Sequence, residues 1–234
     1  MKKSILFLLL FLNMGILKAQ EGGTVVLIHG FLLSAHHMIH IEKALRPTCL
    51  DVYNFEYPAR KDTICGHAQN LIAALKCIAA HQPGQPIHFV THSIGGLILR
   101  CALNEPDCPV EAQIGKAVLL APPNQGSRFA RYFQNWPPVR FFFGPKSGLE
   151  LLTWGPCDVQ RLGAFPDTMQ VLVIAGKRGI HPFFQGCPND HFLLVEETML
   201  ETPYSRVVLC ISHGETLTNE QSIAITRNFL LCGN

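Results

Sequence analysis

Two kinds of apolar pattern alternate along the chain. The continuous apolar, β-rich run "TVVLIHG" (24–30) is typical of a strand buried on both faces, and "IHFVTH" (87–92) is also predicted to be a strand. In the segment 63–81, apolar residues recur every three or four positions, as on a helix with one buried face. Further strands are predicted at 50–57, 116–121, 170–176 and 205–212, and further helices at 36–46, 94–104 and 219–231. This alternation predicts an α/β fold with a mostly parallel central sheet and helices on both faces.

The segment from about 126 to 165 interrupts the alternation. It is rich in aromatic residues, proline and glycine, and no regular period dominates it. An insertion of this length between two core strands is more often a cap or lid than a passive connection. We therefore expect a small aromatic-rich cap in which Phe129, Phe133 and Trp136 are candidate substrate-binding residues. Composition alone supports ordinary packing within the cap equally well.

The first 19 residues have the layout of a secretory signal peptide. Lys2 and Lys3 precede an apolar run over residues 5–12, and the small residue Ala19 is a candidate cleavage site. The run is short for a membrane span, and Asn13 interrupts it. The sequence therefore predicts a secreted or periplasmic protein, with a membrane anchor as the alternative if the leader is not cleaved.

Bulk composition narrows the class of protein. Residues 20–234 suffice for one domain with a single sizeable core. Hydrophobic residues make up 48% of the chain and charged residues 15%, which indicates a packed globular body. The formal net charge of +2 gives no strong basic field, so we expect no nucleic-acid partner.

Cysteine usage is unusual for an exported chain, because all nine cysteines lie beyond the leader and the number is odd. Cys77, Cys101 and Cys210 occupy positions expected on core faces, where free cysteine behaves as a small hydrophobe. The candidate bridges, among which the sequence does not choose, are Cys49–Cys65, Cys101–Cys108 and Cys157–Cys187. The absence of a CxxC motif argues against a zinc ribbon or a thioredoxin-type site.

Ser93 stands where the strand 87–92 is expected to turn into the helix 94–104. A strand that turns abruptly into a helix at a serine is the nucleophile elbow of α/β-hydrolases. The tight turn requires small residues two positions before and after the serine, and Gly95 meets this requirement. On the other side Thr91 replaces the usual glycine. The motif by itself is equally compatible with a nucleophile and with a serine in an ordinary turn.

A serine nucleophile needs a general base, usually a histidine oriented by a carboxylate. In this fold the chain order is Ser, then Asp or Glu, then His. Asp190 lies in the loop after the strand 170–176, and His213 directly follows the strand 205–212. Both are therefore expected at carboxyl ends of strands, where open α/β sheets build their sites. We predict a catalytic triad of Ser93, Asp190 and His213.

Other acids and histidines are weaker candidates. They are Asp158, Asp167, His181, His191, Glu196 and Glu197. The two aspartates precede the strand 170–176, which puts them in the cap or at the wrong end of the sheet. The two histidines lie in the acid-bearing loop and follow no final strand. The two glutamates are expected on a helix surface.

An oxyanion hole needs backbone N–H donors, which we expect from Ile94 and from Phe31 in the loop after the first strand. Gly30 is expected to permit the backbone geometry that turns the Phe31 donor inward.

The stretch "SAHHMIH" places His36 and His40 one helical turn apart, but no carboxylate or cysteine completes a ligand set. We expect a polar helix face there, no metal site and no cofactor.

Several segments together resemble a known family. In chain order they are "IHGFLLS", "HFVTHSIGGLILR", "VLLAPPNQGSRFA", "GPKSGLELLT", "GCPNDHFLLVEETML" and "ISHGETL". They are similar to segments of a bacterial α/β-hydrolase family of lipase and esterase type, over about residues 25–232. The resemblance implies the α/β-hydrolase fold and the same triad. The chain departs from the family at His191, where glycine usually follows the aspartate.

The sequence thus predicts a serine hydrolase that cleaves carboxylic esters of apolar acyl groups. Its expected partners are a small-molecule or lipid ester and, transiently, a membrane surface, and no protein partner is indicated. Two alternatives stay open. One is an acyltransferase or thioesterase with the same triad, and the other is a non-catalytic binding protein on a hydrolase scaffold.

Overall fold

Six parallel strands form the centre of the molecule, within the residues that the computed structural model describes (22–48, 50–180 and 182–232). In spatial order they are β2 (Asp51–Phe55), β1 (Thr24–Ile28), β3 (Ile87–His92), β4 (Lys116–Leu120), β5 (Gln170–Gly176) and β6 (Ser205–Leu209). Every neighbouring pair is parallel, so all carboxyl ends lie at one edge of the sheet. β1, β3 and β4 are buried throughout, as predicted for strands covered on both faces.

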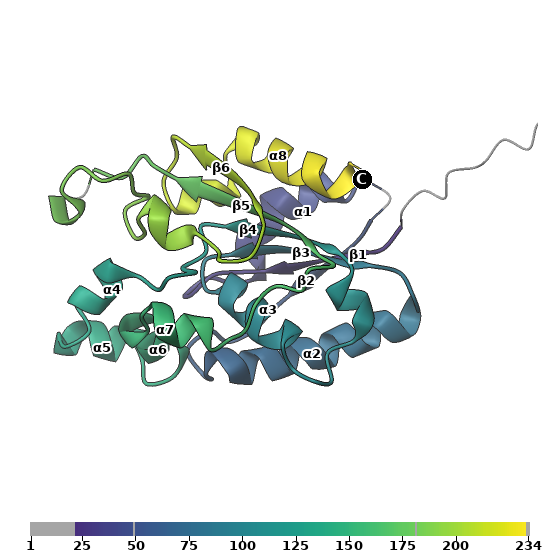
Figure 1. Cartoon of the computed structure of the whole chain (residues 1–234), viewed down its shortest axis with the longest axis horizontal. Coiled ribbons are helices and arrows are strands. Elements are labelled where there is room, and N and C mark those ends of the chain that lie inside the picture. The colour runs from purple at the N-terminus through teal and green to yellow at the C-terminus, as the bar shows by residue number, and fades with distance from the viewer. Residues whose placement is uncertain (1–21, 49, 181, 233–234) are drawn as a thin grey trace, which may run out of the picture.

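Helices cover both faces of this sheet (Figure 1). The helices on these faces are α1 (Ile39–Leu45), α2 (Ile64–His81), α3 (Gly95–Leu103) and α8 (Glu220–Leu231). α2 and α3 pack with one set of strand side chains, which includes Phe89, and α1 and α8 pack with the alternate set, which includes Val90. Short 3-10 helices lie in the connections: η1 (Ala35–Met38), η2 (Val110–Gln113), η3 (Pro182–Phe184), η4 (Val195–Thr198) and η5 (Gly214–Leu217). The predicted α/β-hydrolase architecture is confirmed.

The insertion after β4 folds into four short helices that the sequence pattern did not predict. They are α4 (Arg128–Tyr132), α5 (Pro137–Phe143), α6 (Ser147–Thr153) and α7 (Pro156–Gln160). They gather beside the carboxyl ends of the strands (Figure 1). The α6 helix is attached to the start of α2, because the Glu150 carboxylate accepts the Ile64 N–H at 2.6 Å and Ser147 donates its N–H to the Asp62 carbonyl at 2.9 Å. Helices of five to seven residues are too short to produce a clear apolar period.

The cysteine predictions are largely wrong. A disulfide joins Cys65 in the first turn of α2 to Cys101 in α3, which excludes both the Cys49–Cys65 and the Cys101–Cys108 pairing. The packing of α2 on α3 brings the two Cα atoms to 5.9 Å, a separation that a disulfide can span. The other predicted partners, Cys157 and Cys187, are free and exposed, and so are Cys77 and Cys210, which were expected on core faces. The pairing depends on helix packing, which cysteine spacing does not reveal.

The predicted leader, residues 1–19, lies outside the described residues. Within residues 22–48, 50–180 and 182–232, no helix combines the length and the apolar character needed to cross a membrane.

Candidate active site

The turn at Ser93 is a strained elbow. Ser93 has a φ of +53°, in the left-handed region that residues other than glycine rarely occupy. Its N–H donates to the Leu120 carbonyl at 2.9 Å, which attaches the elbow to β4. A Cβ at position 95 would lie 2.7 Å from the Ile28 carbonyl oxygen, so only glycine fits there. The sharp strand-to-helix turn predicted from the sequence is present.

Thr91 fits where the family motif has glycine because the helix opposite it begins with two glycines. Its side chain is fully buried, and a Cβ at position 96 would lie 3.3 Å from the Thr91 hydroxyl oxygen. Among the described residues, that hydroxyl has no hydrogen-bond partner. Threonine in place of glycine at position 91 therefore leaves one hydroxyl unpaired, but it does not prevent the turn from forming.

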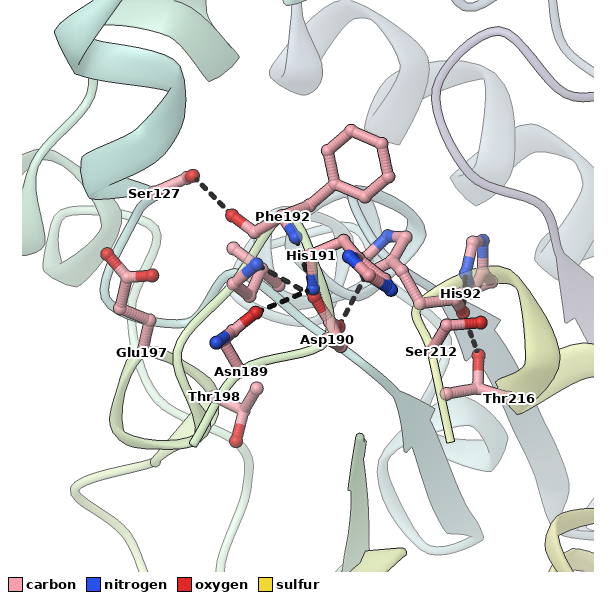
Figure 2. Close-up of polar contacts among 12 residues, drawn as sticks. His92, Ser127, Asn189, Asp190, His191, Phe192, Glu197, Thr198, Ser212 and Thr216 are labelled. Carbon is pink, nitrogen blue, oxygen red and sulfur yellow. Dashed lines mark hydrogen bonds and ion pairs between the residues drawn. The ribbon is translucent and has the colours of Figure 1, made fainter. Parts of the chain in front are cut away.

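Asp190 and His213 form a hydrogen-bonded pair in which Asp190 is buried. The His213 Nδ1–H donates to Asp190 Oδ2 at 2.7 Å, and the His213 backbone N–H donates to the Asp190 carbonyl at 3.0 Å. The other carboxylate oxygen accepts the N–H groups of Phe192 at 3.0 Å and Leu193 at 2.8 Å (Figure 2). The residue is 1% exposed, so these bonds fix the carboxylate in one orientation. With its proton on Nδ1, His213 has a free lone pair on Nε2.

The turn after Asp190 forms with histidine in place of glycine. His191 has a φ of +88°, which explains why glycine is usual at this position. Its N–H donates to the Asn189 side-chain oxygen at 3.0 Å, and the Asn189 amide donates to the carbonyls of Gly179 and Cys187. These bonds hold the loop in shape, so the departure from the family pattern leaves the acid in place.

Ser93 and His213 meet in the wall of one cavity of about 560 Å³, a size typical of ligand pockets. The rest of its lining is mainly apolar and includes Phe31, Phe129, Phe133, Trp136, Val139, Phe143, Leu151, Leu152, Phe192 and Leu193. All three predicted substrate-binding residues are among them. In the described chain no hydrogen bond joins the Ser93 hydroxyl to His213; such bonds often tighten only when substrate is bound.

The loop that carries Phe31 lies against the elbow. Among the described residues, neither the Phe31 nor the Ile94 N–H donates to another protein group. The prediction that Gly30 supplies a special backbone geometry is wrong, because Leu32 and not Gly30 has a positive φ, at +59°. Gly30 is needed for space instead: a Cβ there would lie 2.5 Å from His92 Nδ1.

His29 and Tyr57 support this loop from below. Their rings stack with centroids 4.1 Å apart, and the Tyr57 hydroxyl donates to the His29 carbonyl at 2.8 Å. Burial lowers the pKa of His29, which keeps the ring neutral. The ring therefore shapes the loop and stays out of the cavity lining.

The model of the alpha/beta hydrolase family matches residues 25–214. The chain belongs to this family.

Solved structures of similar fold include enzymes that act on esters. The mature Bacillus licheniformis lipase BlEst2 is 17% identical with a TM-score of 0.71, and the match covers 88% of this chain and 91% of that one. A Pyrococcus furiosus esterase is 20% identical with a TM-score of 0.61, and the match covers 89% and 80% of the two chains. The Legionella pneumophila phospholipase PlaB is 16% identical with a TM-score of 0.64, and the match covers 88% and 59%. At these identities the likeness shows the fold alone. No match was found among curated proteins.

His92 is a site residue of this α/β-hydrolase that sequence reasoning missed. Its Nε2–H donates to the His213 carbonyl at 3.3 Å, and the two rings lie 4.8 Å apart. Burial holds the pKa of His92 well below its usual value, so the ring is neutral. The Thr216 hydroxyl donates to the same carbonyl at 2.7 Å. The available signal was a histidine at the end of a buried strand, directly before the serine.

Glu197 was predicted on a helix surface, and this prediction is wrong. The residue is 4% exposed, and its carboxylate accepts backbone N–H groups from Leu194 and Arg128. The neighbouring Glu196 is exposed, as expected. No sequence signal separates the two glutamates, because the buried one is selected by contacts with a segment about 70 positions earlier.

The remaining candidates lie apart from the cavity lining. Asp158 accepts the Gly155 N–H at 3.0 Å at the start of α7, and His181 lies outside the described residues. Within residues 22–48, 50–180 and 182–232, no group of three or more His, Cys, Asp or Glu side chains could hold a metal ion.

Proposed function

We propose that this α/β-hydrolase is a serine hydrolase of carboxylic esters with apolar acyl groups. One observation carries the proposal: a mainly apolar cavity has in its wall both the strained Ser93 and the imidazole of His213, which Asp190 orients. A nucleophile and a base in the wall of an apolar cavity, with a buried acid bonded to the base, match the requirements of acyl transfer through a covalent intermediate.

In the proposed reaction Ser93 Oγ attacks the ester carbonyl carbon while His213 Nε2 removes the hydroxyl proton. Asp190 keeps the imidazole in the Nδ1–H tautomer and stabilises the imidazolium that forms. The negative oxygen of the tetrahedral intermediate is bound by the N–H groups of Phe31 and Ile94. One such donor contributes about 10²–10³ in kcat. His213 then protonates the leaving alcohol, and water hydrolyses the acyl-enzyme by the same steps.

The acyl chain is proposed to lie against Phe129, Phe133 and Trp136. Phe129 and Phe133 contact each other with ring centroids 5.1 Å apart, and Trp136 continues the aromatic wall at 6.1 Å from Phe133. Burial of each additional methylene contributes about 0.8 kcal/mol, so a longer chain gains affinity until the cavity is full.

We also propose that the enzyme is exported and contacts lipid surfaces transiently. The disulfide between Cys65 and Cys101 supports export, because such bonds persist in oxidising compartments. Contact with a lipid surface is supported by aromatic side chains in the cap: Trp136 is 57% exposed, Phe141 85% and Phe142 57%. Large exposed apolar side chains grouped near a cavity mark interaction surfaces.

The proposal is tested by labelling the purified enzyme with a fluorophosphonate and mapping the modified peptide. The label is expected on Ser93, and Ser93→Ala is expected to lose both labelling and hydrolysis of nitrophenyl esters. A series from acetyl to dodecanoyl esters tests the acyl cavity, since no preference beyond acetyl would remove that part of the proposal. Product analysis with added alcohols separates hydrolysis from acyl transfer. Labelling that persists in Ser93→Ala would refute the assignment of the nucleophile.

A further inference from the structure

Glu197 lies buried between two segments that are far apart in the sequence. Its Oε2 accepts the Leu194 N–H at 2.9 Å, and its Oε1 accepts the Arg128 N–H at 2.5 Å. In Figure 2 the side chain lies below Ser127, beside the loop that carries Asn189 and Asp190. One carboxylate therefore links the loop of the proposed catalytic acid to the beginning of the cap.

Each linked segment contributes to the site on its own side. Arg128 begins α4, and both Phe129 within this helix and Phe133 directly after it lie in the cavity wall. Leu194 follows Phe192 and Leu193, which line the same cavity and whose N–H groups hold Asp190. The Phe192 ring also lies 5.4 Å from the His213 ring. The relative position of acyl wall and catalytic pair thus depends on how these two segments are joined.

Other contacts join the same segments, residues 124–128 and 192–199, which we call the cap seam. The Asn124 amide donates to the Thr198 carbonyl at 2.8 Å, and the Ser127 hydroxyl donates to the Phe192 carbonyl at 3.0 Å. These are bonds between neutral groups. Glu197 is the buried acid of the cap seam, and its Oε1 also lies 3.7 Å from Arg128 Nε, whereas Glu196 is exposed and pairs with the same guanidinium. Burial raises the pKa of Glu197, while the two N–H donors and the nearby guanidinium favour its ionised form.

We propose that Glu197 is a positioning residue that sets the acyl-chain preference of the enzyme, by holding the α4 wall of the cavity at a fixed position relative to Asp190 and His213. This inference rests on the proposed function and deepens it. A short acyl group needs only the elbow, the base and the oxyanion donors. A long acyl group also needs the aromatic wall of α4 in place.

Replacement of Glu197 by glutamine tests this positioning role with almost no change in volume. Both carboxylate oxygens accept N–H groups, but an amide has one oxygen and one NH2. Whichever way the amide turns, its NH2 faces an N–H donor, so one side of the cap seam loses its bond. Glu196→Gln is the matched control, because it makes the same chemical change beside the same Arg128 on a side chain that is 64% exposed.

The measured quantity is the ratio of kcat/KM for octanoyl and acetyl nitrophenyl esters. In Glu197→Gln this ratio is expected to fall about tenfold, because one unpaired buried donor displaces the α4 wall. The kcat/KM for the acetyl ester and the rate of fluorophosphonate labelling are expected to stay close to wild type. Glu196→Gln is expected to keep the wild-type ratio. An unchanged ratio in Glu197→Gln, or a parallel fall for both esters, would overturn the inference.

A second pair of variants decides the question if Glu197→Gln does not fold. Arg128 is the first residue of α4, a position where proline is tolerated, and Ser127 before it has the extended conformation (φ −130°, ψ 117°) that proline requires. Arg128→Pro removes the N–H that Glu197 accepts, and Arg128→Gln keeps it, while both lose the guanidinium. We expect the reduced ratio in the proline variant alone. Equal ratios in the two variants would contradict the role of this bond.

Failure of the proposed hydrolase activity can be recognised separately. If the wild-type enzyme cleaves neither ester, calorimetric titration with octanoate measures the cavity directly. Binding that is about tenfold weaker in Glu197→Gln than in Glu196→Gln retains the positioning role without the reaction. Equal binding in the two variants, or no binding by the wild type, overturns it.

Discussion

Replacement of Asp190 by asparagine is expected to stop the reaction through the tautomer of His213. Asp190 Oδ1 accepts two N–H groups, from Phe192 and Leu193, and Oδ2 accepts the His213 Nδ1–H. In asparagine the single oxygen satisfies the two N–H groups only if it takes the Oδ1 position, so its NH2 faces His213. Nδ1 then has to accept a hydrogen bond, and the ring proton moves to Nε2. An Nε2–H cannot take the proton of Ser93.

The size of the effect follows from the loss of the base. An aspartate-to-asparagine change of this kind in the Ser-His-Asp template lowers kcat about 10⁴-fold, which corresponds to about 5 kcal/mol in the activation barrier. The fold is expected to survive, because the two N–H bonds to the retained oxygen remain. The assay is kcat at saturating octanoyl nitrophenyl ester, with thermal unfolding of each variant measured in parallel. Asp167→Asn, at an exposed position just before β5, is the control and is expected to keep wild-type kcat.

A folded Asp190→Asn enzyme that keeps more than about a tenth of wild-type kcat would refute this role of the His213 tautomer, since loss of the base requires a far larger decrease. Loss of activity in Asp167→Asn to the same degree would also contradict it. A fall in kcat caused only by unfolding is recognised by a lowered melting temperature in the same preparation.

Three further predictions concern the surroundings of the site. Gly30→Ala is expected to lower kcat/KM about 100-fold, because its Cβ would lie 2.5 Å from His92 Nδ1. Gly155→Ala is the neutral control, since a Cβ there would have no atom within 4 Å. Equal kinetics in the two variants would contradict the prediction. Removing the disulfide with Cys65→Ser and Cys101→Ser is expected to lower the free energy of unfolding by about 3–4 kcal/mol for its 36-residue separation, and urea unfolding that matches wild type would exclude this role. Because burial lowers the pKa of His92, the folded state binds fewer protons than the unfolded state below about pH 6.5, so the stabilisation present above that pH is lost as the pH falls. His92→Gln is expected to reduce the loss in unfolding free energy between pH 7 and 5.5 by about 1 kcal/mol, and equal losses in both proteins would argue against a neutral buried His92.

The sheet could be predicted because its strands carry their own signal. β1 and β4 are buried on both faces, and all but the first residue of each strand is apolar. The cap could be predicted only as an insertion. Its helix α4 is five residues long and buries no residue of its own, so neither a period nor an apolar face marks it. What holds it is contact with residues 192–199, and such contacts leave no local pattern.

The triad candidates could be placed together because of the sheet topology rather than any motif that links them. Ser93, Asp190 and His213 each follow a strand of one parallel sheet, and parallel strands end at a common edge. Sheet topology does not predict the role of Gly30, which leaves room for the His92 ring. It does not predict the burial of Glu197 either, because that burial depends on a segment from another part of the chain. Topology predicts which loops meet, whereas steric fit and hydrogen-bond pairing between those loops require coordinates.

Three residues with strained backbone conformations lie in the loops that form the site. Ser93, Leu32 and His191 all have positive φ, and each lies in a loop at the carboxyl edge of the sheet. Backbone strain of about 1–3 kcal/mol at each position persists only where the surrounding contacts hold it. Ser93 is held by the Leu120 carbonyl, His191 by the Asn189 side chain, and the Leu32 turn by the bond from the Leu33 N–H to the Gly30 carbonyl at 3.2 Å. The three turns bring a nucleophile, an acid-bearing loop and a loop with a free N–H to one cavity, so these three strained residues lie where the proposed chemistry needs fixed geometry.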